Sequence, residues 1–185
     1  DQENIANLAN TQIADIAGGS YPAVINILLA IREVEKTGKG QFLDISMTDN
    51  LFPFMWMALG LTVNKFYSKG GDLQLTGGSP RYGIYETLDK GYMALGALEE
   101  KFWLRFCDVI KLPNKFINDS INPNATKEAI IEIVKNKNTK EWKEILVNEK
   151  NICCSIVNSL EEAMQDSQII ERQLLTAKMK LGNEE

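Results

Sequence analysis

The chain contains no histidine, and only three of its 185 residues are cysteines. The first absence excludes a Ser-His-Asp triad or a histidine-rich metal site built from this chain alone. The cysteines are Cys107 and the adjacent pair Cys153 and Cys154, which lack metal-ligand spacing and would form only a strained bridge with each other. We therefore expect no metal site and no structural disulfide. With no signal-peptide leader visible either, we predict a cytoplasmic protein.

Long apolar runs and an excess of positive charge are also lacking. The most apolar stretches, residues 23–31 and 51–61, are shorter than the ~20 residues that cross a bilayer. The net charge of -5 gives no electrostatic reason to expect nucleic acid or an anionic membrane as a partner. The hydrophobic fraction of 44% and the charged fraction of 24% are typical of a globular protein. This length gives room for one domain or for pieces of two.

The most informative stretch runs from residue 77 to residue 103. Gly77, Gly78 and the following Ser-Pro pair predict a turn, and residues 82–86 alternate in the manner of a strand. Asp89-Lys90-Gly91 predicts a tight turn with a positive φ at Gly91, and residues 92–96 predict a second strand. The residues that then fall on one face of a helix are Phe102, Trp103, Phe106, Cys107 and Ile110. The stretch therefore predicts a β-hairpin followed by an amphipathic helix.

Two adjacent glutamates, Glu99 and Glu100, stand at the start of that helix, where the helix dipole favours carboxylates. Pattern alone favours a purely structural role for both. The whole stretch resembles, however, the α-methylacyl-CoA racemases of the class III CoA-transferase (CaiB/BaiF-like) superfamily. In that family a Gly-Gly-x-Pro-x-Tyr run leads through an Asp-Gly turn to Gly-Ala-(Ile/Leu)-Glu-x-x-Phe, which here occupies residues 96–102. The resemblance implies that Glu99, not Glu100, is catalytic.

A second segment, residues 12–20, precedes an apolar helical run at residues 23–34. Asp15 is thus predicted to lie just upstream of a helix N-terminus, beside Gly18 and Gly19, which would let a ligand approach the backbone closely. Backbone N–H groups near these glycines are also candidates for stabilising a substrate oxyanion. On pattern alone Asp15 is a cap or turn residue.

The same family resemblance changes that interpretation of Asp15. Family members carry an aspartate after a small residue, then Gly-Gly-Ser, a long apolar helix and a Gly-(Lys/Arg)-Gly-Gln entry into a strand. Here the strand entry is residues 38–41, and the residue before Asp15 is Ala14, where the family usually has glycine. The resemblance places Asp15 at the position of the catalytic aspartate.

The remaining site residues are implied by the resemblance. Residues 41–46 predict a strand that ends at Met47, and residues 51–61 predict a short apolar helix that contains Met57. The family lines its acyl site with methionines, so Met47 and, more weakly, Met57 are candidates, with plain core packing as the alternative. The substrate-binding set implied as a whole is Gly18, Gly19, Met47, Met57, Gly77, Gly78 and Tyr82. No metal and no separate cofactor are expected, because coenzyme A is part of an acyl-CoA substrate.

The resemblance covers most of residues 12–175 and implies an α/β class III CoA-transferase fold, with part of the large Rossmann-like domain and the smaller α+β domain. We predict that residues 1–62 belong to the large domain, 63–76 form a crossover linker, 77–150 form the small domain and 151–185 return toward the large one. Helices are expected from Thr126 and Thr139, and a strand at residues 152–157. A family member is about twice this length, is an interlocked homodimer, and has its catalytic histidine and most CoA contacts in the first half. The chain is therefore expected to be a fragment that is inactive alone.

Three functions stay open. A racemase inverts the α-carbon of a 2-methylacyl-CoA and needs two acid/base groups that flank this carbon. By resemblance these are Asp15 and the absent histidine, assisted by Glu99. A CoA-transferase would instead use Asp15 as the nucleophile on the acyl thioester. A non-catalytic dimerisation module would use both acidic residues only as caps. The Gly-Ala-Leu-Glu form of the motif favours the racemase; Leu75-Thr76, where the family has Leu-Asp, leaves the acyl substrate open.

Overall fold

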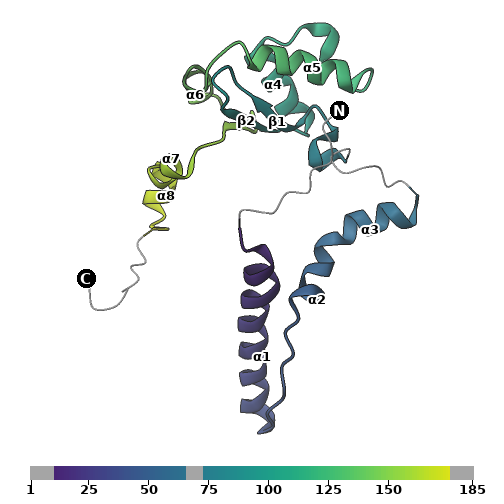
Figure 1. Ribbon diagram of the computed structural model, residues 1–185, viewed down its shortest axis with the longest axis vertical. Helices are drawn as coiled ribbons and strands as arrows, with labels where there is room; N and C mark the ends of the chain where they lie inside the picture. Colours follow the sequence, from purple (N-terminus) through teal and green to yellow (C-terminus); the bar gives the residue numbers. More distant parts are fainter. Residues whose placement is uncertain (1–10, 66–72, 176–185) are drawn as a thin grey trace. The chain divides into compact units, whose positions relative to one another are not determined.

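The computed structural model describes residues 11–65 and 73–175 (Figure 1). The chain divides into two compact units, Asp1–Tyr67 and Ser68–Glu185, and each is described by itself. The division falls within residues 63–76, the predicted crossover, while the domain boundaries themselves stay a prediction. Parts of three predicted segments, residues 1–10, 66–72 and 176–185, lie outside the described residues.

The first unit begins with a long helix. A π-helical turn, Ala14–Ser20 (η1), continues directly into α1, Tyr21–Thr37. Pro22 lies in the first turn of α1, where its missing N–H and fixed φ are tolerated. Gly38 ends α1 in the left-handed conformation with φ of 70°, and its N–H donates to the carbonyl of Val34 at 2.8 Å. The helix predicted for residues 23–34 is confirmed, but helical backbone begins already at Ala14.

This early start changes two expectations about the N-terminal segment. Asp15 lies inside the helical run rather than upstream of it. Together η1 and α1 form a helix of 24 residues, which by length and composition alone is long and apolar enough to cross a membrane. The helix length inferred from the apolar run at residues 23–31 was too short, because the residues that precede this run are also helical. The core helix of a soluble protein meets the same criteria of length and composition. No residue of α1 is buried within the described structure.

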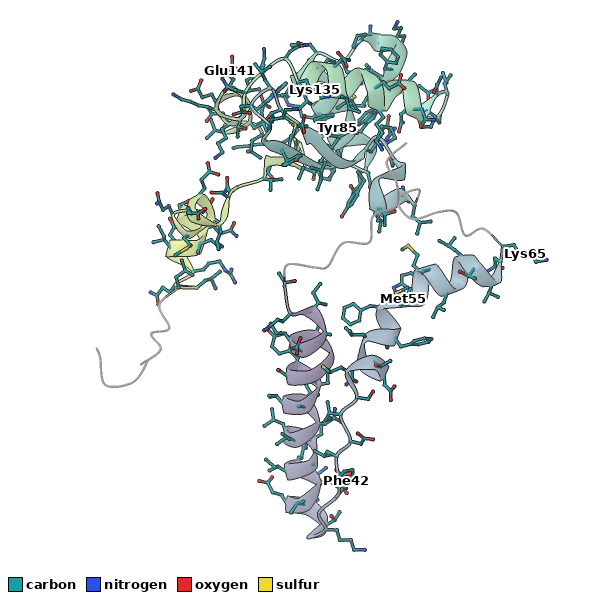
Figure 2. All side chains as sticks on the ribbon, in the orientation of Figure 1. Phe42, Met55, Lys65, Tyr85, Lys135 and Glu141 are labelled. Atoms are coloured by element: carbon teal, nitrogen blue, oxygen red, sulfur yellow. The ribbon has the colours of Figure 1, made fainter. Side chains whose placement is uncertain are left out.

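The chain then returns along α1 in an extended conformation through residues 39–46 (Figure 1). Phe42 on this segment is 91% exposed (Figure 2). The strand predicted for residues 41–46 is wrong for the described structure, because a strand needs a neighbouring strand to pair its backbone groups and none lies along this segment in the described part of the unit.

Three short helices complete the first unit. Ser46 caps α2, Met47–Leu51, by accepting a hydrogen bond from the Asp49 N–H at 3.2 Å. A 3₁₀ turn, Phe52–Met55 (η2), and α3, Trp56–Val63, follow. The helix predicted for residues 51–61 is thus divided, and Pro53 in the first turn of η2 explains the break because it cannot donate to the preceding turn.

The second unit contains a three-stranded antiparallel sheet in the order β1-β2-β3. A helical turn, Gln74–Gly78 (η3), leads into β1, Tyr82–Glu86, which pairs with β2, Tyr92–Gly96. The predicted hairpin is confirmed with both strands at the expected residues. The third strand, β3, Cys154–Ile156, is shorter than predicted and pairs with β2, so the beginning of the predicted return segment belongs to the same sheet as the hairpin.

Helices cover one face of this sheet (Figure 1). They are α4, Glu100–Ile110; a 3₁₀ turn, Asn114–Phe116 (η4); α5, Pro123–Val134; and α6, Thr139–Leu146. Side chains from the sheet and the helices form one core, in which Tyr85 points from β1 toward the helices (Figure 2). The largest fully buried members are Trp103, Trp142, Tyr85, Phe106, Met93, Ile130 and Val134. Two short helices, α7, Leu160–Met164, and α8, Ser167–Glu171, follow β3.

Local capping explains where the helices of this unit begin. Asn122 caps α5 by accepting from the Ala125 N–H at 3.0 Å, so α5 starts at Pro123, earlier than the predicted Thr126. Asn138 caps α6 in a capping box with Glu141, and α6 starts at Thr139 as predicted. The helix face predicted for α4 is also confirmed: Trp103, Phe106, Cys107 and Ile110 are buried.

The hairpin turn differs from the prediction in which residue has a positive φ. That residue is Lys90, with φ of 65°, and not Gly91. Gly91 is required for a steric reason, because a Cβ there would lie 2.2 Å from the Oγ1 of Thr139. Thr139 is in turn fixed by Asp89, whose carboxylate accepts from the Thr139 N–H at 3.0 Å and from its hydroxyl at 2.8 Å. The turn is thereby joined to the first turn of α6.

Candidate functional site

Asp15 lies in the first turn of η1, and its side chain is exposed. Its backbone carbonyl accepts from the Ser20 hydroxyl at 3.0 Å. Within the described residues no donor forms a hydrogen bond with the carboxylate itself, so this group is not used as a cap. The structure therefore leaves the Asp15 carboxylate available for chemistry.

Gly18 and Gly19 bring η1 into close contact with Met47 at the start of α2. A Cβ on Gly18 would lie 2.8 Å from the Met47 carbonyl oxygen, and a Cβ on Gly19 would lie 3.5 Å from Met47 Cγ. The Asn50 amide also donates to the Gly18 carbonyl at 2.9 Å. The structure thus places Asp15, both glycines and Met47 on one small region of the first unit.

This packing gives the glycines a different role from the predicted one. Gly18 is buried against α2, so its missing side chain serves a contact within the protein. Both glycines lie beyond the first four residues of a helical run, where backbone N–H groups are engaged by preceding carbonyls. The expectation that these N–H groups stand open at a helix start is therefore wrong. Met57, on α3, is half-buried in a separate element.

In the second unit, several predicted residues line one hollow on the sheet. The hollow has a volume of about 670 Å³, and its lining includes Gly77, Tyr82, Ile84, Gly96 and Cys153. This volume is within the range of ~300–1,000 Å³ that is usual for small-molecule sites. Gly77 has a φ of 102°, which favours glycine, and its carbonyl accepts from Lys127 Nζ at 2.8 Å. Gly78, the next residue, lies at the end of η3.

Glu99 lies three residues beyond Gly96 and is the residue that precedes the first turn of α4. Its backbone is extended, with φ of -73° and ψ of 139°, and its carbonyl accepts from the N–H groups of Phe102 and Trp103, both at 3.0 Å. Its carboxylate makes no capping bond and has no hydrogen-bond donor among the described residues. Glu100, by contrast, accepts from Arg81 at 2.6 Å. The structure therefore distinguishes two adjacent glutamates: one is paired, and the other is not.

Arg81 is a residue that our sequence reasoning missed. Its guanidinium reaches Glu100 on one side and Asp119 on the other, with Nε 3.0 Å and Nη2 2.7 Å from Asp119 Oδ1. Burial by itself lowers the pKa of Arg81, but the hydrogen bonds to Asp119 and Glu100 outweigh this effect and raise it. The only available signal was a basic residue directly after the Gly-Gly-Ser-Pro turn; its partner Asp119 is 38 residues away.

All three cysteines are free thiols, and two of them are poorly suited to nucleophilic chemistry. Burial raises the pKa of Cys107 and of Cys154 to about 12, so both thiols stay protonated at neutral pH. Cys153 is exposed. In the described part of the chain no group of three His, Cys, Asp or Glu side chains is arranged to hold a metal ion.

Comparison with known proteins agrees with these features. Residues 2–182 match the family model of CoA-transferase family III. The chain belongs to this family. Human α-methylacyl-CoA racemase is 29% identical over 168 residues, which are 86% of this chain and 43% of the human protein. The mouse α-methylacyl-CoA racemase is 28% identical over 166 residues, again 43% of that protein. This chain thus spans less than half the length of these relatives.

Two solved structures support the fold. Rv3272 from Mycobacterium tuberculosis superposes with a TM-score of 0.72 at 18% identity, covering 94% of this chain and 46% of that one. A CaiB/BaiF family protein from Brucella suis gives a TM-score of 0.69 at 16% identity, covering 96% and 50%. The predicted class III CoA-transferase fold is therefore confirmed. The family and the two named relatives are enzymes of the racemase or CoA-transferase type.

The predicted site residues of this family III chain fall in two groups. Asp15, Gly18, Gly19 and Met47 meet in the first unit, whereas Gly77, Tyr82 and Glu99 belong to the second. In the first unit Gly18 and Gly19 contact Met47, and in the second unit Gly77 and Tyr82 line one hollow. Their roles toward a substrate stay a prediction.

Proposed function

We propose that the whole protein containing this chain is an isomerase of the α-methylacyl-CoA racemase type, which inverts the α-carbon of 2-methylacyl-CoA thioesters. The observation that carries the proposal is the environment of Glu99. Its carboxylate is unpaired among the described residues. Gly96, three residues before it in the sequence, lines an apolar hollow together with Gly77 and Tyr82. The human and mouse relatives, both named racemases, support the same assignment.

Racemisation requires two proton-transfer groups on opposite faces of the α-carbon. One group removes the proton; the electron pair of the broken C–H bond moves into the thioester carbonyl and gives an enolate. A second group then returns a proton to the other face. We assign Asp15 to one face. The sequence has no histidine, so the base on the other face comes from outside this chain, with Glu99 assisting it. The reaction involves no net oxidation, and coenzyme A enters as part of the substrate.

We infer that the acyl group binds against the apolar lining of the hollow in the second unit. The hollow at Gly77 and Tyr82 offers a mostly apolar lining, which suits an alkyl chain. In the first unit Met47 packs against Gly18 and Gly19, on the same element, η1, that contains Asp15, and its flexible apolar side chain is a second candidate for acyl contact. Met57 in the first unit and Gly78 in the second are further candidates for contact with the substrate.

The whole protein is further proposed to be a cytoplasmic homodimer that binds acyl-CoA. The apolar side chains of α1 support an assembled state. Among them, Val24, Ile25, Ile27, Leu28, Leu29 and Ile31 are all exposed. The remainder of the fold or a second subunit would cover this apolar surface and remove it from water.

A CoA-transferase is the second candidate, and the name of the matching family favours it. In that reaction the Asp15 carboxylate attacks the thioester carbonyl, the C–S bond breaks, and CoA thiolate leaves a mixed anhydride on the enzyme. The CoA thiolate then attacks the Asp15 carbonyl carbon of the anhydride, which releases the first carboxylate and leaves CoA as a thioester on Asp15. A second carboxylate takes up CoA by the same two steps in reverse, with no bond to the α-hydrogen broken. The fate of that hydrogen therefore separates the two reactions.

The test uses the whole protein in deuterated water with one enantiomer of a 2-methylacyl-CoA. We expect deuterium at the α-carbon together with inversion, and Glu99→Gln is expected to lower kcat by about 100-fold or more, as is usual for loss of an acid/base group. Glu144→Gln, on the exposed side of α6, is the matched control and should leave the rate unchanged. Transfer of CoA to a second carboxylic acid without exchange at the α-carbon would replace the racemase by the transferase. If the protein shows neither activity, both proposed reactions are contradicted and a non-catalytic module is favoured.

A further inference from the structure

We propose that Arg81 is the positioning residue for Glu99. Its guanidinium, held by Asp119, fixes the loop of residues 97–100 from which the Glu99 carboxylate extends. This inference rests on the proposed function, in which Glu99 assists proton transfer. Arg81 itself is assigned no contact with the substrate.

The first step of the argument is that Arg81 contacts the loop on both sides of Glu99. Before Glu99, the N–H of Ala97 donates to the Arg81 carbonyl at 2.9 Å, and Arg81 Nη1 donates to the Leu98 carbonyl at 3.4 Å. After Glu99, the same Nη1 donates to Glu100 Oε2 at 2.6 Å. One residue therefore restrains the two neighbours of Glu99 while leaving its side chain uncontacted.

The second step is that the guanidinium is itself held firmly. Nε and Nη2 of Arg81 both donate to Asp119, and the two side chains are only 17% and 14% exposed. Arg81 Cζ also lies 5.0 Å from the centroid of the buried Trp103 ring, one turn into α4. A planar guanidinium that donates two hydrogen bonds to a carboxylate has a specific geometry that a lysine ammonium group cannot reproduce.

The third step is that the rate of proton transfer depends on the position of Glu99. Proton transfer depends on the distance and direction of the group that performs it, and a misplacement of about 1 Å can cost ~100-fold in rate. Substitution of the Arg81 side chain removes its hydrogen bonds to the Leu98 carbonyl and to Glu100, although Glu99 itself is unchanged. The hydrogen bond from the Ala97 N–H to the Arg81 backbone carbonyl is kept. The rate of the proton-transfer step therefore falls, whereas substrate binding through other residues is retained.

The test is a double-mutant cycle in the whole protein, with deuterium exchange at the α-carbon as the readout. We expect Arg81→Gln and Arg81→Lys each to lower kcat about tenfold or more, with a smaller change in KM. In the Glu99→Gln background the same substitutions should have no further effect, because they act through Glu99. A general loss of stability would instead lower both backgrounds by the same factor, which would overturn the proposal.

Arg105→Gln is the matched control. Arg105 lies on the same helix, α4, and forms ion pairs with Asp108 and Glu149, but none with residues 97–100. Its substitution should leave kcat unchanged. If Arg81→Gln does not fold, Asp119→Asn loosens the same guanidinium with an almost isosteric change and is expected to lower kcat in the same Glu99-dependent way.

A second readout does not depend on activity. Amide hydrogen exchange of residues 97–103 in the whole protein should become faster in Arg81→Gln and stay unchanged in Arg105→Gln. Equal exchange in the two variants would refute the positioning role even if the enzyme proves active. An inactive wild-type protein with faster exchange in Arg81→Gln would refute the proposed function while keeping the structural role of Arg81.

Discussion

Asp89 shows how a single side chain joins two elements and makes stability depend on pH. Its carboxylate accepts from the Thr87 hydroxyl at 2.6 Å and from Thr139, which ties the hairpin turn to the start of α6. These hydrogen bonds, the one from Thr87 first and then those from Thr139, lower the pKa of Asp89 from its usual value of 3.8 to about 2.

The sign of the effect follows from this lowered pKa. Because the folded-state pKa lies below the unfolded one, the stabilisation is complete above about pH 4 and is lost as the pH falls toward about 2. We therefore expect the melting temperature of the wild-type chain to fall across this window by more than that of Asp89→Asn. Asp44→Asn, an exposed aspartate in the first unit, should keep the wild-type pH dependence. Identical profiles for all three would contradict this account.

Candidate site residues could be selected from the sequence where a local motif contains them. Residues that depend on distant partners could not be selected in this way. Glu99 was selected from the Gly-Ala-Leu-Glu motif, and the structure adds that Glu100 is the paired member of the two. Arg81 was missed because Asp119 and Leu98 are brought to it only by the fold. The positive φ predicted for Gly91 was wrong, because Lys90 has it instead. The closeness of Thr139, which requires a glycine at position 91, could not be predicted from the turn sequence.

At the scale of elements, the contact between η1 and α2 depends on one glycine. A Cβ on Gly18 would lie 2.8 Å from the Met47 carbonyl and 3.0 Å from Leu51 Cγ, so α2 would have to move. We expect Gly18→Ala to lower the free energy of unfolding by about 1–3 kcal/mol, the usual cost of overpacking. Gly19→Ala is the matched control, because its Cβ would have only ordinary contacts, the nearest at 3.5 Å. Denaturant unfolding of both variants checks this, and equal stability would contradict the packing argument.

The elements themselves were predicted best where their determinants are local. The hairpin and the buried face of α4 follow from alternation and helical spacing, and both are confirmed. The strand at residues 41–46 was wrong, because the apolar pattern of a strand does not supply the neighbouring strand that it needs. The helical start at Ala14 was missed because two consecutive glycines favour a turn by propensity, whereas here they allow close packing against α2.

At the scale of the whole molecule, the chain holds only part of a family III protein. It spans 43% of the human racemase that it resembles, and no side chain of α1 is buried within the described residues. A long helix with apolar residues on several faces is stable in water only when other protein, or a membrane, covers it. Family membership favours cover by protein. The proposed chemistry has the same requirement, since the second base is absent from this sequence.

The central claim is that Asp15 is one of two bases acting on opposite faces of the α-carbon. The most direct measurement follows deuterium incorporation and inversion separately for the two enantiomers of a 2-methylacyl-CoA, with Asp15→Asn in the whole protein. The account predicts that inversion is lost, while exchange survives for the enantiomer whose α-hydrogen faces the second base. Inversion at the wild-type rate in Asp15→Asn would contradict the account.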